Sequence, residues 1–459
     1  MPSFNDCIVV PFGLAELAGA SSAVGVLAYA DGQYLPAMSA APVNQHTVFV
    51  AHSRNGKFVA CLCRVLSETQ YPPSVSFSNT AYQVDVYDTD SWQRVHTIDP
   101  LEGGANFPNA VVVSNAGVVA IAAAGDGVRV VDAVGKAELA VLTFADGPPA
   151  TYMGTNMAQV LDFSPNEDYL FVARVAYGVA AFKTADWTRD AAMKLDAAFY
   201  DPEAGDDGAM QSPTNWLKFS PAGDAVYLYG PEHGFRGKSW PALQPLTLPA
   251  FNMGGSVRDL GFSPDGQTLF YTLAADGSGV GTLTKLNLAD AGAEPVDVLV
   301  TAADTFKSMA NVGFSLSADG TKVALMGYVP GNLVNREYGG ADQAATVIVA
   351  DAGTGAVEKT TLWTIRGFLL DTFCRFAVWL PVAKLQLVTG LIKDEAGAGV
   401  ARTVVLQPRE QDSPMQPYWT QSDATGRFKV PVAATGKVLN RIALDSTGTF
   451  NDLIDKVQV

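Results

Sequence analysis

The densest group of side chains that could bind a metal or move a proton is an acidic cluster in the segment FYDPEAGDDGAM. Its members are Asp201, Glu203, Asp206 and Asp207. Carboxylate oxygens are the ligands that Ca²⁺ prefers, but the spacing does not match an EF-hand loop. Solvated loop charge is therefore the favoured interpretation. A calcium site and catalytic carboxylates stay open, since acids from separate repeats can also form a pair for glycoside hydrolysis.

The remaining chemistry-bearing residues give no catalytic or cofactor motif. The four histidines have no metal-ligand spacing, which disfavours a zinc site; they are His46, His52, His96 and His233. His52 stands where other repeats carry Phe163, Phe219 and Phe262, so it is expected on an inner strand with its ring hydrogen-bonded. The chain has no G-x-S-x-G elbow, no Walker motif and no G-x-G-x-x-G motif that opens a helix. No cofactor and no metal are predicted, and a non-enzymatic protein is expected.

The four cysteines, Cys7, Cys61, Cys63 and Cys374, contain no C-x-x-C motif. Cys61 and Cys63 are two residues apart on a predicted strand, so their side chains lie on the same side as small core residues. A disulfide framework is not expected, which is consistent with folding in a reducing cytoplasm.

Aromatic residues gather in four long segments at 67–81, 146–158, 196–214 and 328–343. Such side chains give a recognition surface a large area with little rotamer freedom. For a single Tyr, packing on its own loop is the favoured interpretation; for the set as a whole, binding is favoured. The binding-face candidates are Tyr71, Phe77, Tyr152, Phe199, Tyr200, Tyr328, Arg336 and Tyr338.

These segments must be positioned by a repeated element, whose clearest mark is a Ser between an apolar strand and a short turn. It occurs at Ser53, Ser114, Ser164, Ser220, Ser263 and Ser317. The spacing, 43 to 61 residues, is close to one β-propeller blade per repeat. Six copies at equivalent positions favour a turn residue whose hydroxyl caps backbone groups over a catalytic nucleophile.

Each repeat contains four predicted strands, which is the unit of a propeller blade. In the third repeat they cover 159–164, 169–174 and 178–183, with a fourth after Trp187. Six full blades begin near Thr47, Asn109, Ala158, Asn215, Arg258 and Asn311. A seventh can be closed by pairing 371–380 with strands from the first 46 residues, which removes exposed sheet edges. The chain is thus predicted to be an all-β, seven-bladed propeller, with six blades and an N-terminal extension as the alternative.

The four long segments are expected on one face of this propeller. Loops between second and third strands emerge on the same face as loops between blades, and the short Ser turns lie on the opposite face. Binding is therefore expected opposite the Ser turns. The FSPDG repeats with their D-x-x-T/S turns resemble the YVTN and WD40-like β-propellers, although the GH and WD dipeptides are absent. That resemblance implies the fold and no particular activity.

From about residue 383 the blade pattern ends and short alternating strands follow, separated by DEAGAG, SDATG and AATG turns. We predict a propeller over 1–382 and a small β-sandwich over 383–459. The motifs LVTGLIKDEAGAGVARTVVL and SDATGRFKV resemble the carboxypeptidase-regulatory-like, prealbumin-like sandwich, an Ig-like arrangement. The ending RIALDSTGTFNDLIDKVQV is similar to modules at the C-termini of bacteriophage tail-associated proteins.

The formal charge of −16 argues against a nucleic-acid partner, because phosphate binding needs clustered Lys and Arg. The sequence has no basic residue before its first apolar stretch and no long apolar span, so no secretory signal and no membrane insertion are expected. With the phage resemblance, this favours a virion structural protein of the tail tip, baseplate or fibre that acts in assembly or host adsorption. It would fold in the host cytoplasm and bind other virion proteins and a host surface receptor. The alternatives are a propeller hydrolase or lyase acting on carbohydrate, and a bacterial surface or scaffold propeller.

Overall fold

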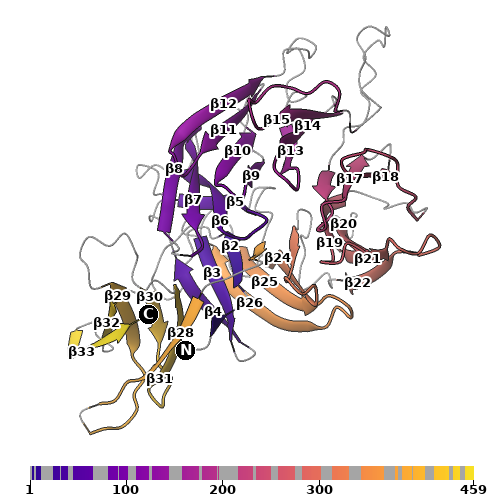
Figure 1. The fold of residues 1–459 in the computed structure, drawn as a ribbon. Coiled ribbons are helices and arrows are strands. Elements are labelled where there is room, and N and C mark those ends of the chain that lie inside the picture. The colour runs from indigo at the N-terminus through magenta and orange to yellow at the C-terminus, as the bar shows by residue number, and fades with distance from the viewer. Residues whose placement is uncertain are drawn as a thin grey trace, which may run out of the picture.

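The structure, a computed structural model, places short antiparallel β-sheets around an axis (Figure 1). It describes residues 3–4, 7–11, 24–30, 33–39, 45–65, 81–90, 93–101, 110–122, 127–143, 158–174, 178–193, 195, 216–230, 234–249, 257–273, 282–300, 313–329, 343–365, 378–380, 385–394, 396–408, 418–433, 438–444 and 450–458. Every element formed by these residues is a strand, so the predicted all-β class is confirmed.

Six sheets follow one another along the chain, and the first strand of each ends directly before a repeated Ser. In each sheet, consecutive strands pair as antiparallel neighbours. The first three sheets are β5 (Gln45–His52), β6 (Phe58–Val65), β7 (Ala81–Asp88) and β8 (Gln93–Leu101); β9 (Val111–Val113), β10 (Val118–Ala122), β11 (Gly127–Asp132) and β12 (Ala137–Thr143); and β13 (Ala158–Phe163), β14 (Tyr169–Arg174) and β15 (Gly178–Lys183). The next three are β16 (Trp216–Phe219), β17 (Ala225–Gly230) and β18 (Gly234–Ser239); β19 (Val257–Phe262), β20 (Thr268–Leu273), β21 (Thr282–Asn287) and β22 (Val296–Val300); and β23 (Phe314–Leu316), β24 (Lys322–Val329), β25 (Gln343–Asp351) and β26 (Val357–Ile365).

The third and fourth sheets have only three strands each within the described residues. Where a fourth strand was predicted after Trp187, the chain makes a single bridge between Phe182 and Arg189. The reason is local: Trp187 has a positive φ, and its N–H bonds back to the carbonyl of Lys183. A tight turn therefore takes up the residues that a longer strand would need.

A further sheet, the closing sheet, joins the two ends of this succession. It consists of β27 (Val378–Leu380), β2 (Cys7–Pro11), β3 (Val24–Ala30) and β4 (Gln33–Ser39), in that order. Val9 of β2 pairs with Val378 of β27, so the strand expected in 371–380 does combine with N-terminal strands. We call β5, β9, β13, β16, β19, β23 and β27 the inner strands. Each contacts the next, and β27 contacts β5, which makes the arrangement propeller-like.

The core lies between neighbouring sheets. One buried cluster joins Phe58 and Leu62 of the first sheet to Val111 and Ile121 of the second, and the later pairs of consecutive sheets share clusters of the same kind. Because both faces of a sheet are covered, second strands such as β17 are apolar and buried along their whole length. Cys61 and Cys63 lie in such a strand, β6, and are buried in the core, as predicted.

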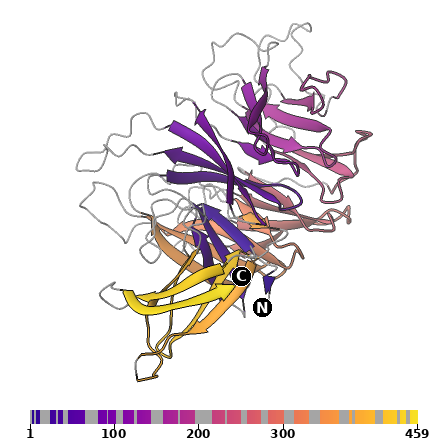
Figure 2. The ribbon, with the colours of Figure 1, turned by 60° about the vertical axis from the view of Figure 1, so that its left-hand side comes forward.

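The last part of the chain forms two separate sheets, which we call the C-terminal module. One contains β1 (Ser3–Phe4), β28 (Leu385–Leu391) and β31 (Arg427–Ala433); the other contains β30 (Tyr418–Gln421), β29 (Thr403–Pro408), β32 (Val438–Leu444) and β33 (Phe450–Gln458). Figures 1 and 2 show this module on one side of the ring, where β31 contacts β4. The structure differs from the predicted division at one point, because β1 pairs with β28 rather than with a propeller strand.

Candidate functional site: the axial cavity

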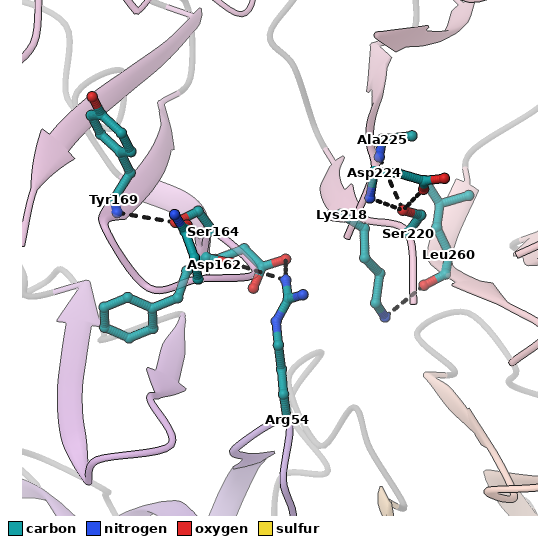
Figure 3. Close-up of polar contacts among 11 residues, drawn as sticks. Arg54, Asp162, Ser164, Tyr169, Lys218, Ser220, Asp224, Ala225 and Leu260 are labelled. Carbon is teal, nitrogen blue, oxygen red and sulfur yellow. Dashed lines mark hydrogen bonds and ion pairs between the residues drawn. The ribbon is translucent and has the colours of Figure 1, made fainter. Parts of the chain in front are cut away.

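The repeated Ser residues build the turns that end the inner strands. In all six turns the Ser Oγ accepts a hydrogen bond from the first backbone N–H of the next strand or its neighbour, at 2.9–3.1 Å. In five of them Oγ also donates to an Asn or Asp, as Ser220 does to Asp224 (Figure 3). The predicted capping role of these hydroxyls is confirmed.

Neighbouring Ser turns interlock, which fixes the spacing of the inner strands on this face. The Gly of one turn lies against the Pro of the turn before it. A Cβ at Gly223 would stand 2.6 Å from Pro165, and one at Gly320 would stand 2.4 Å from Pro264. Both glycines also have positive φ, the conformation that glycine adopts at least cost. In the first turns hydrogen bonds replace this packing, since Asn115 accepts from the backbone of Asn55.

The inner strands surround a cavity of about 520 Å³, the axial cavity, which lies toward the end that carries the Ser turns. Most of its lining is apolar and includes Phe49, Trp216, Phe314 and Trp379. The residue two places before each repeated Ser also lines it; these residues are Ala51, Val112, Asp162, Lys218, Gly261 and Ser315. Two of the six are charged, so this position gives the cavity a polar side.

Arg54 crosses between sheets that are not neighbours. It belongs to the first Ser turn, yet its Nη2 donates to the carbonyl of Phe163 at 3.0 Å and lies 3.8 Å from Oδ2 of Asp162 in the third sheet (Figure 3). Its guanidinium also sits over the ring of Phe219 in the fourth sheet, 5.5 Å from the centroid. Arg54 therefore joins three sheets at the Ser-turn end of the cavity.

Two opposing effects act on Asp162. Burial raises the pKa of its carboxyl group, because a charge is costly away from water. The charges of Arg54 and Lys218 and the backbone of Phe219 and Phe163 act in the opposite direction and lower the pKa. The net direction is upward.

Lys218 and His52 complete the polar side. The Lys218 Nζ donates to the carbonyl of Leu260 at 2.8 Å (Figure 3), and Lys218 as a whole is exposed. The His52 Nδ1 lies 2.7 Å from the Ser53 carbonyl, so Nδ1 carries the proton and Nε2 is an acceptor. Burial lowers the pKa of His52, and nearby Lys218 lowers it further, so the ring is neutral at pH 7. The predicted inner-strand position and hydrogen-bonded ring of His52 are thus confirmed.

Asp259 also lines the cavity, but its carboxyl group has a structural role. It is 2% exposed, and its two oxygens accept hydrogen bonds from the backbone N–H groups of Leu260, at 2.8 Å, and Phe314, at 2.9 Å. This carboxyl group therefore ties β19 to the neighbouring β23. Chemically, the cavity offers an apolar volume lined by two cations, Arg54 and Lys218, and by the partly exposed carboxyl group of Asp162. This arrangement suits the binding of a ligand.

The predicted binding-face residues and this cavity are different sets. Seven of the eight candidates lie outside the described residues: Tyr71, Phe77, Tyr152, Phe199, Tyr200, Arg336 and Tyr338. So do the calcium candidates Asp201, Glu203, Asp206 and Asp207. Tyr328 was expected in a loop, but its backbone lies in β24 and pairs with Ala345. Within the described part of the chain, no three His, Cys, Asp or Glu side chains are grouped to hold a metal.

The cavity residues could have been found from the repeats themselves. Aligning the six Ser residues puts Asp162 and Lys218 at a position where the other repeats carry Ala, Val, Gly or Ser. A charge at a position that faces the axis is the signal. The pairing of Arg54 with Asp162 has no such signal, because these residues are 108 positions apart and the turn residue of the other repeats is Asn, Pro or Ala.

No protein-family model matches the chain, and no curated protein matches it. Among solved structures it is similar to a candidate 6-phosphogluconolactonase from Bacteroides uniformis, with 17% identity and a TM-score of 0.49 over 78% of this chain and 95% of that one. A second such protein, from Bacteroides fragilis, has 15% identity and a TM-score of 0.47 over 83% and 96% of the two chains. The Cps50 (Swd1) β-propeller domain of Myceliophteria thermophila has 12% identity and a TM-score of 0.43 over 69% and 86%. We therefore assign the propeller-like fold from the strand pairing, and no activity is carried over.

Among the described residues, no helix is long and apolar enough to cross a membrane.

Proposed function

We propose that this chain is a non-enzymatic structural protein of a bacteriophage virion, at the tail tip, baseplate or a fibre. In this proposal residues 5–382 form a seven-bladed β-propeller, and 383–459, with β1, form a prealbumin-like sandwich. Support for seven blades comes from the inner strands, whose contacts run from β5 through β27 and back to β5. Support for a sandwich comes from the two sheets of the C-terminal module and its turns, where Asp394 and Asp423 accept backbone hydrogen bonds.

The observation that carries the proposal is how the C-terminal module is joined to the ring. β31 and β30 contact β4 of the closing sheet, and β1 reaches from the other end of the chain to pair with β28. An appendage fixed at several points holds a constant position relative to the ring, which a structural connector needs. The resemblance of the C-terminal sequence to phage tail-associated modules supplies the biological setting.

In this proposal the module attaches the protein to other virion proteins, and the face opposite the Ser turns meets a neighbour or a host surface receptor. The protein folds in the host cytoplasm and leaves the cell by lysis. The formal charge of −16 supports solubility before assembly, because free copies repel one another.

Mass spectrometry of purified particles tests the virion assignment. We expect the full chain in particles from the phage or prophage that encodes it, and a chain that ends at 382 to be made, folded and missing from them. The truncated chain is compared with the full chain by circular dichroism, so that misfolding is not mistaken for loss of attachment. If the full chain is absent from particles, the virion assignment is wrong; if the truncated chain is incorporated normally, the attachment role is wrong.

A second candidate, a hydrolase or lyase on carbohydrate, is favoured by the presence of Asp162 and His52 in the axial cavity. It ranks second because Arg54 engages Asp162 and backbone N–H groups engage Asp259. Release of reducing ends from a host surface polysaccharide, abolished by Asp162→Asn, would favour this candidate over the first.

A further inference from the structure

We propose that the axial cavity binds a small organic anion, with its charged head at Lys218 and Arg54 and its apolar body against the inner strands. The head is a carboxylate or a phosphate ester. This site is separate from the attachment surfaces proposed above and does not depend on the virion assignment.

The size and lining of the cavity fit such a molecule. Its volume of about 520 Å³ lies within the range, on the order of 300–1,000 Å³, of cavities that hold small ligands. Such sites are mainly apolar, with a few polar groups that orient the ligand. Here Phe49, Trp216 and Phe314 give the apolar part, and Arg54, Asp162 and Lys218 line the cavity within two positions of a repeated Ser.

Arg54 and Lys218 use only part of their hydrogen-bond donors within the described residues. The Asp259 oxygens accept from two backbone N–H groups, and the Asp162 carboxyl group is held by Arg54 and nearby backbone. By contrast, among the described residues Lys218 donates once and Arg54 once, although an ammonium has three N–H groups and a guanidinium five. A ligand that brings acceptor oxygens uses these donors; a cationic ligand would meet them unfavourably.

Both cations line the axial cavity, and Arg54 Nη2 stands 3.8 Å from Asp162 Oδ2. The charges of Arg54 and Lys218 both lower the pKa of the Asp162 carboxyl group. The charge of Lys218 also lowers the pKa of His52, the residue directly before Ser53. His52 is neutral and offers Nε2 as an acceptor, so it adds no positive charge and suits a ligand hydroxyl beside the head.

A purely structural role for the same residues is the competing explanation. Lys218 binds the Leu260 carbonyl of the next sheet, and Lys285 makes the same kind of bond to the Gly353 carbonyl, also at 2.8 Å. Lys285 does not line the cavity. Lys285→Met therefore removes an equivalent contact between sheets without touching the proposed site, and it serves as the matched control for Lys218→Met.

The experiment measures binding of two fluorescent probes to the full chain. 8-Anilinonaphthalene-1-sulfonate carries an anionic head, and N-phenyl-1-naphthylamine has the same aromatic body without it. We expect the wild-type protein to bind the sulfonate at least about tenfold more tightly, the effect of one or two charge-assisted hydrogen bonds. Lys218→Met should abolish this difference, and Lys285→Met should keep it within about twofold of wild type. Val112→Trp, which fills the cavity, should weaken binding of both probes.

Circular dichroism and thermal unfolding of each variant confirm that it is folded before binding is compared. Competition with octanoate and with octyl phosphate, below their micellar concentrations, then identifies the head group, and displacement of the sulfonate by either one supports the proposal. Equal affinity of the wild-type protein for the two probes, equal effects of Lys218→Met and Lys285→Met, or displacement by neither competitor would overturn it.

Discussion

At the residue scale, a Ser turn such as that of Ser263 depends on three residue types. The Ser263 hydroxyl accepts a hydrogen bond from the N–H of Thr268 and donates one to Asp265, and Gly266 takes positive φ. These contacts lie within a few residues of one another, so each turn forms from its own sequence. The Pro of one turn and the Gly of the next then set the distance between adjacent inner strands.

Two glycines with the same φ of +71° separate the backbone effect from this packing. A Cβ at Gly266 would lie 3.7 Å from Pro221, an ordinary contact, whereas one at Gly320 would lie 2.4 Å from Pro264. Both Gly→Ala variants lose about 1–2 kcal/mol from the positive φ. We expect Gly320→Ala to lose about 1–3 kcal/mol more because of overpacking. Denaturant unfolding measures the difference, and equal losses would contradict the interlocking of the turns.

The turn aspartates also predict how stability depends on pH. Hydrogen bonds from Ser263 and Gln267 lower the pKa of Asp265, and those from Ser317 and Thr321 lower the pKa of Asp319, from an ordinary 3.8. Because the folded-state pKa is below the unfolded one, these carboxylates stabilise the fold above about pH 3.8. That stabilisation is lost as the pH falls through the folded-state pKa values.

A double variant, Asp265→Asn with Asp319→Asn, tests this sign. Its melting temperature should fall less than that of the wild type between pH 6 and pH 3, because two of the carboxylates whose protonation destabilises the fold are absent. The profile is followed by thermal unfolding at constant ionic strength. A variant with the same acid dependence as wild type would show that these hydrogen bonds do not favour the ionised form.

At the element scale, the closing sheet is the place where the ring depends on both ends of the chain. β2 lies between β27 and β3, so it is the strand that joins the N-terminal and C-terminal contributions. β1 has a different role, since it pairs with β28 in the C-terminal module.

Two N-terminal deletions distinguish these strands. Removing residues 1–12 takes away β1 and β2, and we expect the melting temperature of the ring to fall by about 5 °C or more because the closing sheet is broken. Removing residues 1–4 takes away β1 alone and should leave that transition within about 2 °C. Scanning calorimetry measures both. Equal melting temperatures for the two deletions would mean that β2 does not hold the ring closed.

At the scale of the whole molecule, the ring and the C-terminal module have separate hydrophobic cores. Buried Val404, Leu406 and Phe428 belong to the module, whereas the clusters between neighbouring sheets belong to the ring. Contacts between the two parts involve mainly β4 and β31. Units with their own cores can fold independently.

A fragment covering residues 5–382 should therefore fold by itself. We expect its melting temperature to match the ring transition of the full chain, and a second transition, present only in the full chain, to belong to the module. Calorimetry of both proteins provides the comparison. An insoluble fragment, or one that melts about 10 °C lower, would show that ring and module form one cooperative unit.

Much of this architecture could be predicted because it depends on short stretches of chain. Ser263, Asp265 and Gly266 stand within four positions, and β20, the strand that follows, is a short run of mainly apolar residues that is buried on both faces. Closure between the ends was also predictable, since unpaired edge strands at both ends of a repeat array favour each other. The cut between 382 and 383 missed the pairing of β1 with β28, because a two-residue strand carries no pattern of its own.

The sequence by itself determined the all-β class, the six Ser turns and the pairing of a strand in 371–380 with the N-terminal strands. Only the tertiary structure decided that Arg54 crosses to Asp162, that Lys218 lies near both His52 and Asp162, and that Asp259 is used up by backbone N–H groups. The physical reason is the distance along the chain over which each interaction acts. Turn chemistry acts over a few bonds, whereas convergence on the axis depends on how sheets far apart in the chain are rotated and packed against one another.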